Sequence, residues 1–415
     1  MNKIIKNTLL KIASFLLNKL HNLLHLWLQC KPLPDSMINS RKVNIAVFLD
    51  FPYAYAGIYT LIRSITQNDR FNLLIIYHKS SLFTEEENLN FLNFLKKNKV
   101  NYQLSSEASI ARLDYLVRVR PFDALIPFKY RSAALRILGV RLIYYPYGIM
   151  LLGGSRNFKN FSFPIHNLAY KVISQSDDYK YMFFRYGACC GKNVVTAGNP
   201  MVDYVMEKAN KSLAPESDLF IFRQSHSKII LWITHHSADS SNANASFERY
   251  CNQIISFMLK NPNYGLIFRP HPFLKNRICH SKENEPAHTL DLLQAYDLLT
   301  SKKIPNVYYD QSYDFVESFN ASDLAISDLT SLLPLYALTQ KPVVLLSSKN
   351  TPDVHVGFES FISNFEIVHR WIDVESFMSG TLVLRKSKEK LHENLTQFLG
   401  IDERLSAERI IDLMK

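Results

Sequence analysis

Cysteine is scarce in this sequence, which contains five cysteines among 415 residues and no Cys-x-x-Cys pair. An odd number of cysteines without that spacing argues against a disulfide framework and against a structural zinc site. We therefore expect a protein of a reducing compartment that carries no metal and no other cofactor.

A run of Lys and Arg with interleaved aromatic residues is also absent, although the formal net charge is +11. Such an excess suits an anionic partner, which is a phosphorylated small molecule, a nucleic acid or an acidic membrane surface. Without a concentrated basic stripe, nucleic acid is the disfavoured partner. The composition, with 47% hydrophobic and 20% charged residues, is that of a globular protein long enough for two domains.

No acidic residue precedes Asp35. Apolar residues recur at helical spacing from Ile5 to Trp27, but lysines interrupt them too often for a membrane span of about 20 apolar residues. No small-residue cleavage site follows, which disfavours a signal peptide. Residues 1–40 are predicted to form a basic amphipathic helix and a linker. This helix either lies on an anionic membrane or packs on its own domain.

Short apolar runs alternate with helical patterns along the rest of the chain. The runs 43–49, 71–78, 228–234 and 265–270 are typical of buried parallel strands, and 122–128 is read as continuing the series. This alternation predicts an α/β protein with two Rossmann-like, doubly wound domains that face a cleft. The predicted parts are an N-terminal domain, a linker, a C-terminal domain and C-terminal helices, at 41–205, 206–226, 227–375 and 376–415.

Loops that follow strands are the expected sites of chemistry, because ligands of such sheets bind beyond the carboxyl ends of the strands. In one such loop, Pro270 and Pro272 each restrict the residue before them to extended backbone, so Arg269 and His271 are held in a narrow range. Arginine offers bidentate phosphate binding, and histidine can donate a proton or a hydrogen bond to a phosphate oxygen. The alternative is a loop histidine that only caps backbone.

Hydroxyl groups occur at a predicted strand-to-helix turn. Ser327 and Asp328 follow a short apolar run, and Thr330 and Ser331 stand where a helix should begin. Hydroxyls and free backbone N–H groups at a helix N-terminus form an anion site. Plain N-capping by Asp328 or Thr330 is the alternative.

Two adjacent histidines follow another predicted strand. Thr234 and Ser237 are candidate contacts of a phosphate or ribose, and either His235 or His236 is expected to face the cleft. No partner at zinc-ligand spacing accompanies them, so no metal is expected here. Solvated loop histidines are the alternative.

Read in order, these motifs resemble the CDP-glycerol glycerophosphotransferase family, which comprises bacterial teichoic-acid and capsule polymerases and primases. The resemblance implies a GT-B fold, with an N-terminal acceptor domain and a C-terminal nucleotide-donor domain. It also implies membrane association and a catalytic His271 that assists departure of the nucleotide. The residues implied to bind the donor's phosphates or nucleotide are Thr234, His235, Arg269, Asp328, Thr330 and Ser331.

Two positions depart from the family's pattern. The family usually has His-Gly at the end of an N-domain strand, where the histidine is a candidate base, and this chain has Tyr147–Gly148. Tyrosine, with a pKa of about 10, is a poor base at neutral pH, although Tyr147 is the acceptor-side candidate. Leu335 stands where the family often has an acidic residue for the ribose.

The leading hypothesis is a peripheral enzyme at the cytoplasmic face of the inner membrane. It would transfer a polyol phosphate, similar to glycerophosphate, from a CDP-activated donor to a lipid-linked or growing cell-surface glycan. The alternatives are a GT-B glycosyltransferase that uses a nucleotide sugar in capsule or lipopolysaccharide synthesis, and a non-catalytic assembly protein of the same fold.

Overall fold

The computed structural model describes residues 42–151, 160–238, 242–281, 286–349, 354–355 and 358–414. The predicted basic helix at 1–40 lies outside these residues. Among the helices of the described part, none has the length and apolar character needed to cross a bilayer.

The N-terminal half forms a seven-stranded sheet in the order β3-β2-β1-β4-β5-β6-β7, and all neighbouring strands run parallel. Its strands are β1 Val43–Leu49, β2 Phe71–Tyr77, β3 Tyr102–Leu104, β4 Tyr115–Arg118, β5 Arg141–Tyr144, β6 Lys171–Ser174 and β7 Val194–Thr196. Its helices are η2 Pro52–Ala54, α2 Tyr55–Thr66, α3 Glu85–Lys97, η3 Asp123–Leu125, η4 Phe128–Tyr130, α4 Ser132–Ile137, α6 Pro164–Leu168, α7 Asp177–Tyr186 and α8 Pro200–Lys208.

The C-terminal half forms a six-stranded parallel sheet in the order β10-β9-β8-β11-β12-β13. Its strands are β8 Lys228–Ile233, β9 Tyr264–Arg269, β10 Val307–Tyr309, β11 Leu324–Ser327, β12 Val343–Leu346 and β13 Glu366–Val368. Its helices are α9 Asp218–Gln224, α10 Phe247–Lys260, α11 Leu274–Ser281, α12 Pro286–Thr300, α13 Val316–Ala321, α14 Leu332–Ala337, α15 Glu359–Ile362, α16 Trp371–Ser379, α17 Lys388–Leu399 and α18 Ser406–Asp412.

The predicted α/β class with two doubly wound sheets is confirmed. Continuous apolar runs form the central strands β1, β8 and β9, whose side chains are almost all buried because helices cover both faces of a parallel sheet. The segment 122–128 is not a strand, contrary to the prediction. β4 ends at Arg118, and short 3₁₀ turns follow it at η3 and η4.

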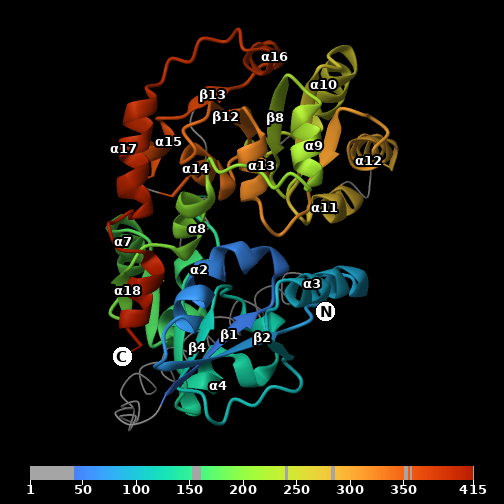
Figure 1. Cartoon of the computed structure of the whole chain (residues 1–415). Coiled ribbons are helices and arrows are strands. Elements are labelled where there is room, and N and C mark those ends of the chain that lie inside the picture. The colour runs from blue at the N-terminus through green and yellow to red at the C-terminus, as the bar shows by residue number, and fades with distance from the viewer. Residues whose placement is uncertain are drawn as a thin grey trace, which may run out of the picture.

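The chain returns to the N-terminal domain at its end. Figure 1 shows α17 and α18, in red, running along one side of the molecule from the C-terminal sheet to the N-terminal one. At the turn between them, Gly400 has a φ of 63°, and a Cβ there would lie 1.8 Å from the carbonyl oxygen of Gln175, so no other residue fits. Asp203 of α8 then fixes the start of α18, because its carboxylate accepts hydrogen bonds from Ser406 Oγ (2.9 Å) and the Ala407 N–H (3.0 Å).

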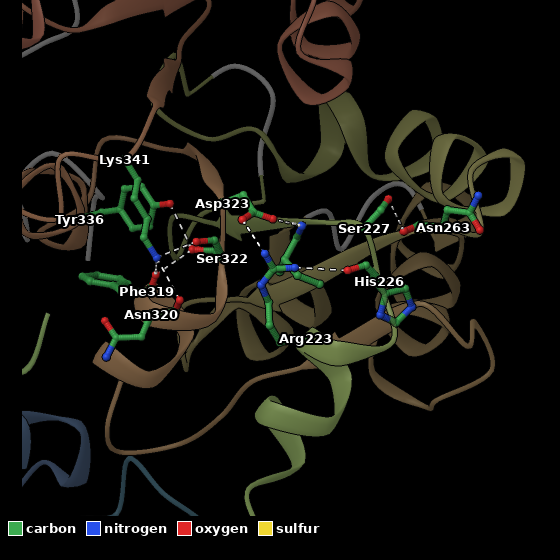
Figure 2. Close-up of polar contacts among 11 residues, drawn as sticks. Arg223, His226, Ser227, Asn263, Phe319, Asn320, Ser322, Asp323, Tyr336 and Lys341 are labelled. Atoms are coloured by element: carbon green, nitrogen blue, oxygen red, sulfur yellow. Dashed lines mark hydrogen bonds and ion pairs between the residues drawn. The ribbon is translucent and has the colours of Figure 1, made fainter. Parts of the chain in front are cut away.

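A half-buried cation lies at the C-terminal end of α13 in the C-terminal domain. Figure 2 shows Lys341, whose ammonium donates to the carbonyl oxygens of Phe319 (2.7 Å), Asn320 (2.9 Å) and Ser322 (2.7 Å). These carbonyls lie at the C-terminal end of α13, where backbone N–H donors run out, and the ammonium satisfies them together with Ser322 Oγ, which also donates to Phe319 (3.1 Å). Burial lowers the pKa of Lys341 to about 8.

An ion pair attaches helix α9, which lies in the connection between the two sheets, to the C-terminal domain. Arg223 of α9 donates to Asp323 Oδ1 (2.9 Å), as Figure 2 shows, and Asp323 Oδ2 accepts the N–H of Ile229 at the start of β8 (2.7 Å). Helix α9 is therefore fixed to the edge of this sheet from which β8 and β11 begin.

Candidate functional site

Two cavities meet between the two sheets. Cavity A, of about 230 Å³, takes most of its wall from the C-terminal domain, including the ends of β8, β9 and β10 and the loops after them. Cavity B, of about 330 Å³, takes most of its wall from residues between Val119 and Phe163 of the N-terminal domain. Four residues line both cavities, namely Tyr147, His271, Thr330 and Ser331. Groups bound in the two cavities would therefore meet at this junction, which holds both predicted catalytic residues.

The tautomer of His271 follows from one hydrogen bond. Its Nδ1 accepts the backbone N–H of Phe273 (3.1 Å), so a neutral ring carries its proton on Nε2. The pKa of His271 is lowered to about 3, chiefly by burial and in addition by the nearby His236, His235 and Arg277. His271 is therefore an uncharged hydrogen-bond donor at neutral pH.

Arg269 lines cavity A, but its charge is already paired. Its Nη1 lies 2.5 Å from Asp310 Oδ2, and its Nη2 donates to the carbonyl oxygen of Ser312 (3.0 Å). Only 8% of Arg269 is exposed. The guanidinium that was predicted to bind phosphate is therefore paired with Asp310. Through this pair and the bond to Ser312, Arg269 holds the loops after β9 and β10 together.

Asp328 lines neither cavity, although the sequence suggested a phosphate contact. It is fully buried, and its Oδ2 accepts the backbone N–H groups of His235 (2.6 Å) and Ser246 (3.1 Å). Burial raises the pKa of Asp328 to about 7, and the hydrogen bonds from Ser246 and His235 oppose that rise. Its position makes it a support for the loop after β8 and for the start of α10.

Hydroxyl groups surround the junction. Thr330 and Ser331 precede α14, as predicted, and Thr330 Oγ1 accepts the N–H of Leu332 (3.3 Å). Thr234 is part of the wall of cavity A, and its buried hydroxyl has no hydrogen-bond partner among the described residues. Gly148 faces Ser331 closely, since a Cβ at Gly148 would lie 3.2 Å from Ser331 Oγ. The two domains are therefore in near contact at this point.

Three imidazoles form a group beside cavity B. His235 and His236 have ring centroids 3.9 Å apart, and the ring of His236 stands edge-on to that of His271 at 5.4 Å. All three histidines line cavity B. The Nδ1 of His235 accepts the N–H of Ser237 (3.1 Å), which places the proton of its neutral ring on Nε2 as in His271.

Tyr147 faces the imidazole group from the N-terminal domain. Burial raises the pKa of Tyr147, an effect that Arg120 opposes and Asp50 reinforces. Arg120 and Asp50 form a buried ion pair at 3.0 Å near the carboxyl ends of β1 and β4. A phenol with a raised pKa donates a hydrogen bond at neutral pH and is unsuited to removing a proton.

Sequence reasoning missed several residues of cavity A. The aromatic side chains of Phe51, Tyr53, Tyr296 and Tyr309 line it, together with Lys275. Tyr309 ends β10 and Phe51 follows the end of β1 by two residues, at the edge where ligands bind, and that position was the available signal. Tyr296 comes from the long helix α12, where nothing in the sequence distinguishes it from a core residue. Within the described ranges, no group of three His, Cys, Asp or Glu side chains is arranged to hold a metal.

Comparison with known proteins extends these observations. The sequence profile of the CDP-Glycerol:Poly(glycerophosphate) glycerophosphotransferase family matches residues 134–351. The teichoic acid ribitol-phosphate polymerase TarK of Staphylococcus aureus is 24% identical over 180 residues, which are 41% of this chain and 31% of TarK. The alignment thus spans about a third of that relative's length.

Solved structures share the fold at low identity. The wall teichoic acid polymerase TagF has a TM-score of 0.56 at 12% identity, covering 100% of this chain and 98% of that chain. The UDP complex of S. aureus MnaA has a TM-score of 0.55 at 13% identity, covering 90% and 96%. A Neisseria meningitidis UDP-GlcNAc 2-epimerase bound to UDP-GlcNAc gives 0.54 at 14% identity, covering 89% and 99%. The predicted GT-B-like fold is confirmed.

Proposed function

This chain belongs to the CDP-glycerol:poly(glycerophosphate) glycerophosphotransferase family, and from this premise we propose that it transfers a polyol phosphate from a CDP-linked donor. The acceptor is a hydroxyl of a lipid-linked or growing cell-surface glycan at the cytoplasmic face of the inner membrane. The observation that carries the proposal is the neutral His271 at the junction of cavities A and B, flanked by the hydroxyls of Thr330 and Ser331.

Cavity A is assigned to the nucleotide diphosphate. Thr330 and Ser331 offer hydroxyl donors to its phosphates, Thr234 forms part of the wall beside them, and Lys275 supplies a cation in the wall. The aromatic side chains of this cavity offer faces on which a base can stack. Because Arg269 is paired with Asp310, phosphate binding rests on neutral donors more than the sequence suggested.

The reaction needs one bond made and one broken at phosphorus. The acceptor oxygen bonds to the phosphorus of the polyol phosphate, and the bond from that phosphorus to the bridging oxygen breaks. CMP leaves with the bridging oxygen and its electron pair. His271, as a neutral donor, hydrogen-bonds to the oxygen on which charge develops, which stabilises the transition state. The acceptor's proton must go to a base on the side of cavity B.

His236 is the group that we assign to that proton. His235 and His271 each accept a backbone N–H at Nδ1, so their Nε2 atoms are donors. Tyr147 is a donor as well, because its pKa is raised. His236 is the third imidazole of the group and lines cavity B but not cavity A. In this assignment Tyr147 orients the acceptor hydroxyl and His236 takes its proton.

Calorimetric titration with CDP, UDP, GDP and CMP, followed by CMP release from CDP-glycerol, tests the function. Preferred binding of CDP with CMP release supports it. Preference for a UDP nucleotide and turnover of a UDP sugar would favour the glycosyltransferase alternative, which the UDP complexes among the structural relatives make worth testing. Nucleotide binding without turnover of any donor would favour the non-catalytic alternative. A chain that binds no nucleotide would contradict both enzymatic functions.

The base assignment is tested separately. His236→Asn is expected to lower kcat by about 10²-fold or more, the usual contribution of a positioned base, while the Kd for CDP stays unchanged. Tyr147→Phe is the comparison variant, expected to lose less rate than His236→Asn because it removes only an orienting hydrogen bond. If Tyr147→Phe abolishes turnover and His236→Asn does not, the phenol rather than the imidazole handles the proton.

A further inference from the structure

Cavity A has two ends, which the order of the strands defines. In the C-terminal sheet, β11, β8, β9 and β10 are successive neighbours, and a residue of the cavity wall follows each of them, namely Thr330, Thr234, His271 and Gln311. In the N-terminal sheet the successive neighbours are β5, β4, β1 and β2. Wall residues follow three of these strands, namely Tyr147 after β5, Tyr53 after β1 and Glu87 after β2.

Two contacts between the domains align these two series of strands. Gly148, after β5, lies against Ser331, after β11, because a Cβ at Gly148 would be 3.2 Å from Ser331 Oγ. Tyr313, after β10, lies against α3, which follows β2, and its ring centroid is 5.0 Å from those of Phe91 and Phe94. Cavity A therefore runs from the junction with cavity B, beside β5 and β11, to a far end beside β2 and β10. Neighbouring strands are about 4.8 Å apart, so the three steps from β11 to β10 span about 14 Å.

The far end of cavity A is the place for the base of a bound nucleotide. The function proposed above puts the phosphates at the junction, beside His271, Thr330 and Ser331. A nucleotide that lies along the cavity then has its base between β2 and β10. The rings of Tyr53 and Tyr309 offer stacking surfaces there, and stacking accepts any base. Selection of one base therefore depends on the polar side chains of this end.

Asp310 is one of two acidic residues that the described part of the chain contributes to the wall of cavity A, and its carboxylate is already used. Its Oδ2 is paired with Arg269 and accepts the hydroxyl of Ser318, and its Oδ1 accepts the N–H of Ser312 (2.8 Å). Only 2% of Asp310 is exposed. This carboxylate therefore holds the loop after β10 and has no oxygen left for a ligand.

Glu87 is the other acidic residue of the wall, and one of its oxygens remains available. Its Oε2 caps α3, because it accepts the backbone N–H (2.7 Å) and the hydroxyl (3.0 Å) of Thr84. No described residue donates to its Oε1, and the side chain is half-buried. Capping thus fixes the position of the carboxylate and leaves Oε1 as an acceptor.

The charge of Glu87 acts on the far end of the cavity. Burial raises the pKa of Tyr53, and Tyr313, Glu87 and Tyr309 raise it further, whereas Arg269 opposes the rise. The phenol of Tyr53 is therefore within electrostatic range of the Glu87 carboxylate, and both residues belong to the wall of cavity A. An acceptor with negative charge accordingly faces a base bound at this end.

The two common pyrimidine bases differ in what they present to such an acceptor. Cytosine carries an amino group on C4, which donates, whereas uracil carries the oxygen O4, which accepts. A carboxylate binds the first and repels the second, so one side chain supplies both attraction and rejection. The amide of Gln311, across the same end, can donate or accept and therefore fits either base. Discrimination falls to Glu87.

We propose that Glu87 selects cytosine, with its Oε1 accepting a hydrogen bond from the 4-amino group of the donor's base. This inference rests on the proposed function, because it takes cavity A to hold a CDP-linked donor. It adds that the N-terminal domain, which supplies Glu87, takes part in recognising the base of the donor.

Replacing Glu87 by glutamine changes the base-facing atom and preserves the cap. The amide oxygen of glutamine can still accept from Thr84, so the Tm should stay close to that of the parent, while an NH₂ group takes the place of Oε1. That NH₂ group suits O4 of uracil. By calorimetric titration of the full chain, the preference for CDP over UDP is expected to fall about 10- to 100-fold in Glu87→Gln, the usual worth of a hydrogen bond to a charged group. Glu86→Gln is the matched control, because Glu86 is exposed on the same turn, lies outside the wall and should leave the preference unchanged.

A modified nucleotide tests the atom pair itself. The diphosphate of pyrimidin-2-one riboside lacks only the 4-amino group of CDP. The parent should bind this compound at least about tenfold more weakly than CDP, and Glu87→Gln should lose most of that difference. A difference of the same size in both proteins would overturn the proposal, because the amino group would then bind elsewhere.

The remaining outcomes separate this proposal from the proposed function. If the parent prefers CDP and releases CMP but Glu87→Gln keeps the same preference, the function stands and the role of Glu87 is refuted. An equal change in Glu86→Gln would also refute it, because the effect would then come from the net charge of α3. If the preference for CDP depends on Glu87 but no CMP is released from CDP-glycerol, base selection stands and the transfer function fails. A parent that prefers UDP or binds no nucleotide would overturn both.

Discussion

Replacing His271 by asparagine or by glutamine separates the two nitrogens of its ring. The Oδ1 atom of asparagine reaches the place of Nδ1 and can still accept the N–H of Phe273, but nothing remains at the place of Nε2. The amide of glutamine reaches the place of Nε2 and can donate there, but leaves the Phe273 N–H without its acceptor. The pair therefore distinguishes a donor that acts on the substrate from a side chain that only caps the loop.

The expected magnitudes differ for the two nitrogens. Losing a donor aimed at charge that develops in the transition state lowers kcat by about 10²- to 10³-fold, which is about 2.7–4 kcal/mol. Losing the hydrogen bond to the Phe273 N–H costs about 1 kcal/mol of folding stability. We expect His271→Asn to fold like the parent and to lose at least about 100-fold in kcat, and His271→Gln to keep more activity with a slightly lower Tm.

The assay is CMP release from CDP-glycerol, with the Kd for CDP measured in parallel. Because burial holds the pKa of His271 at about 3, kcat/KM of the parent should show no acidic limb from this group near neutral pH. If both variants retain full activity, His271 only caps the loop. If glutamine is much less active than asparagine, the nitrogen that matters is Nδ1, and the tautomer deduced from the structure is wrong.

Three further predictions concern the scaffold. Lys341→Met should lower the free energy of unfolding in urea by about 2 kcal/mol, because three carbonyl groups lose a charged donor; an unchanged value would mean that solvent replaces the ammonium. Asp203→Ala should lower the free energy of unfolding by about 1 kcal/mol and make α18 sensitive to limited proteolysis, because α18 loses the cap at its start. Asp203→Asn is the milder control. An equal loss of stability in both variants would mean that the charge of Asp203 matters and not its role as a cap. Burial holds the pKa of His166 at about 3 when folded, against 6.5 for an unperturbed histidine. The unfolded chain therefore binds the additional proton and stability falls as pH falls below about 6.5; His166→Phe should reduce this slope by up to about 1.4 kcal/mol per pH unit in urea titrations at several pH values.

The central strands were predictable because a parallel sheet covered on both faces requires unbroken apolar runs, as in 43–49 and 228–233. The same signal misled at 122–128, where the apolar residues are not in a strand. Leu125 and Phe128 of that stretch are exposed, and a composition of apolar residues does not say whether they face a core or the surface. Tertiary position, absent from the sequence pattern, decides that question.

The candidate site was predictable as a set of loops but not as a set of contacts. Strand ends place His271, Thr330 and Thr234 at one edge, which the alternation of strands and helices already implied. The partner of Arg269 is Asp310, which directly follows the neighbouring strand β10, and no spacing in the sequence specifies that ion pair. The role of Asp328 likewise depends on two backbone N–H groups from the segment that follows β8.

The two prolines around His271 account for its tautomer as well as for its position. Pro272 has no N–H, so the first backbone donor available beyond the imidazole is that of Phe273, and this is the group bonded to Nδ1. Once Nδ1 is an acceptor, the neutral ring must hold its proton on Nε2. Burial then prevents a second proton from binding at neutral pH. The sequence Arg-Pro-His-Pro-Phe therefore produces an imidazole that donates a hydrogen bond without carrying charge. Such a group strengthens its interaction as negative charge develops on a departing phosphate oxygen.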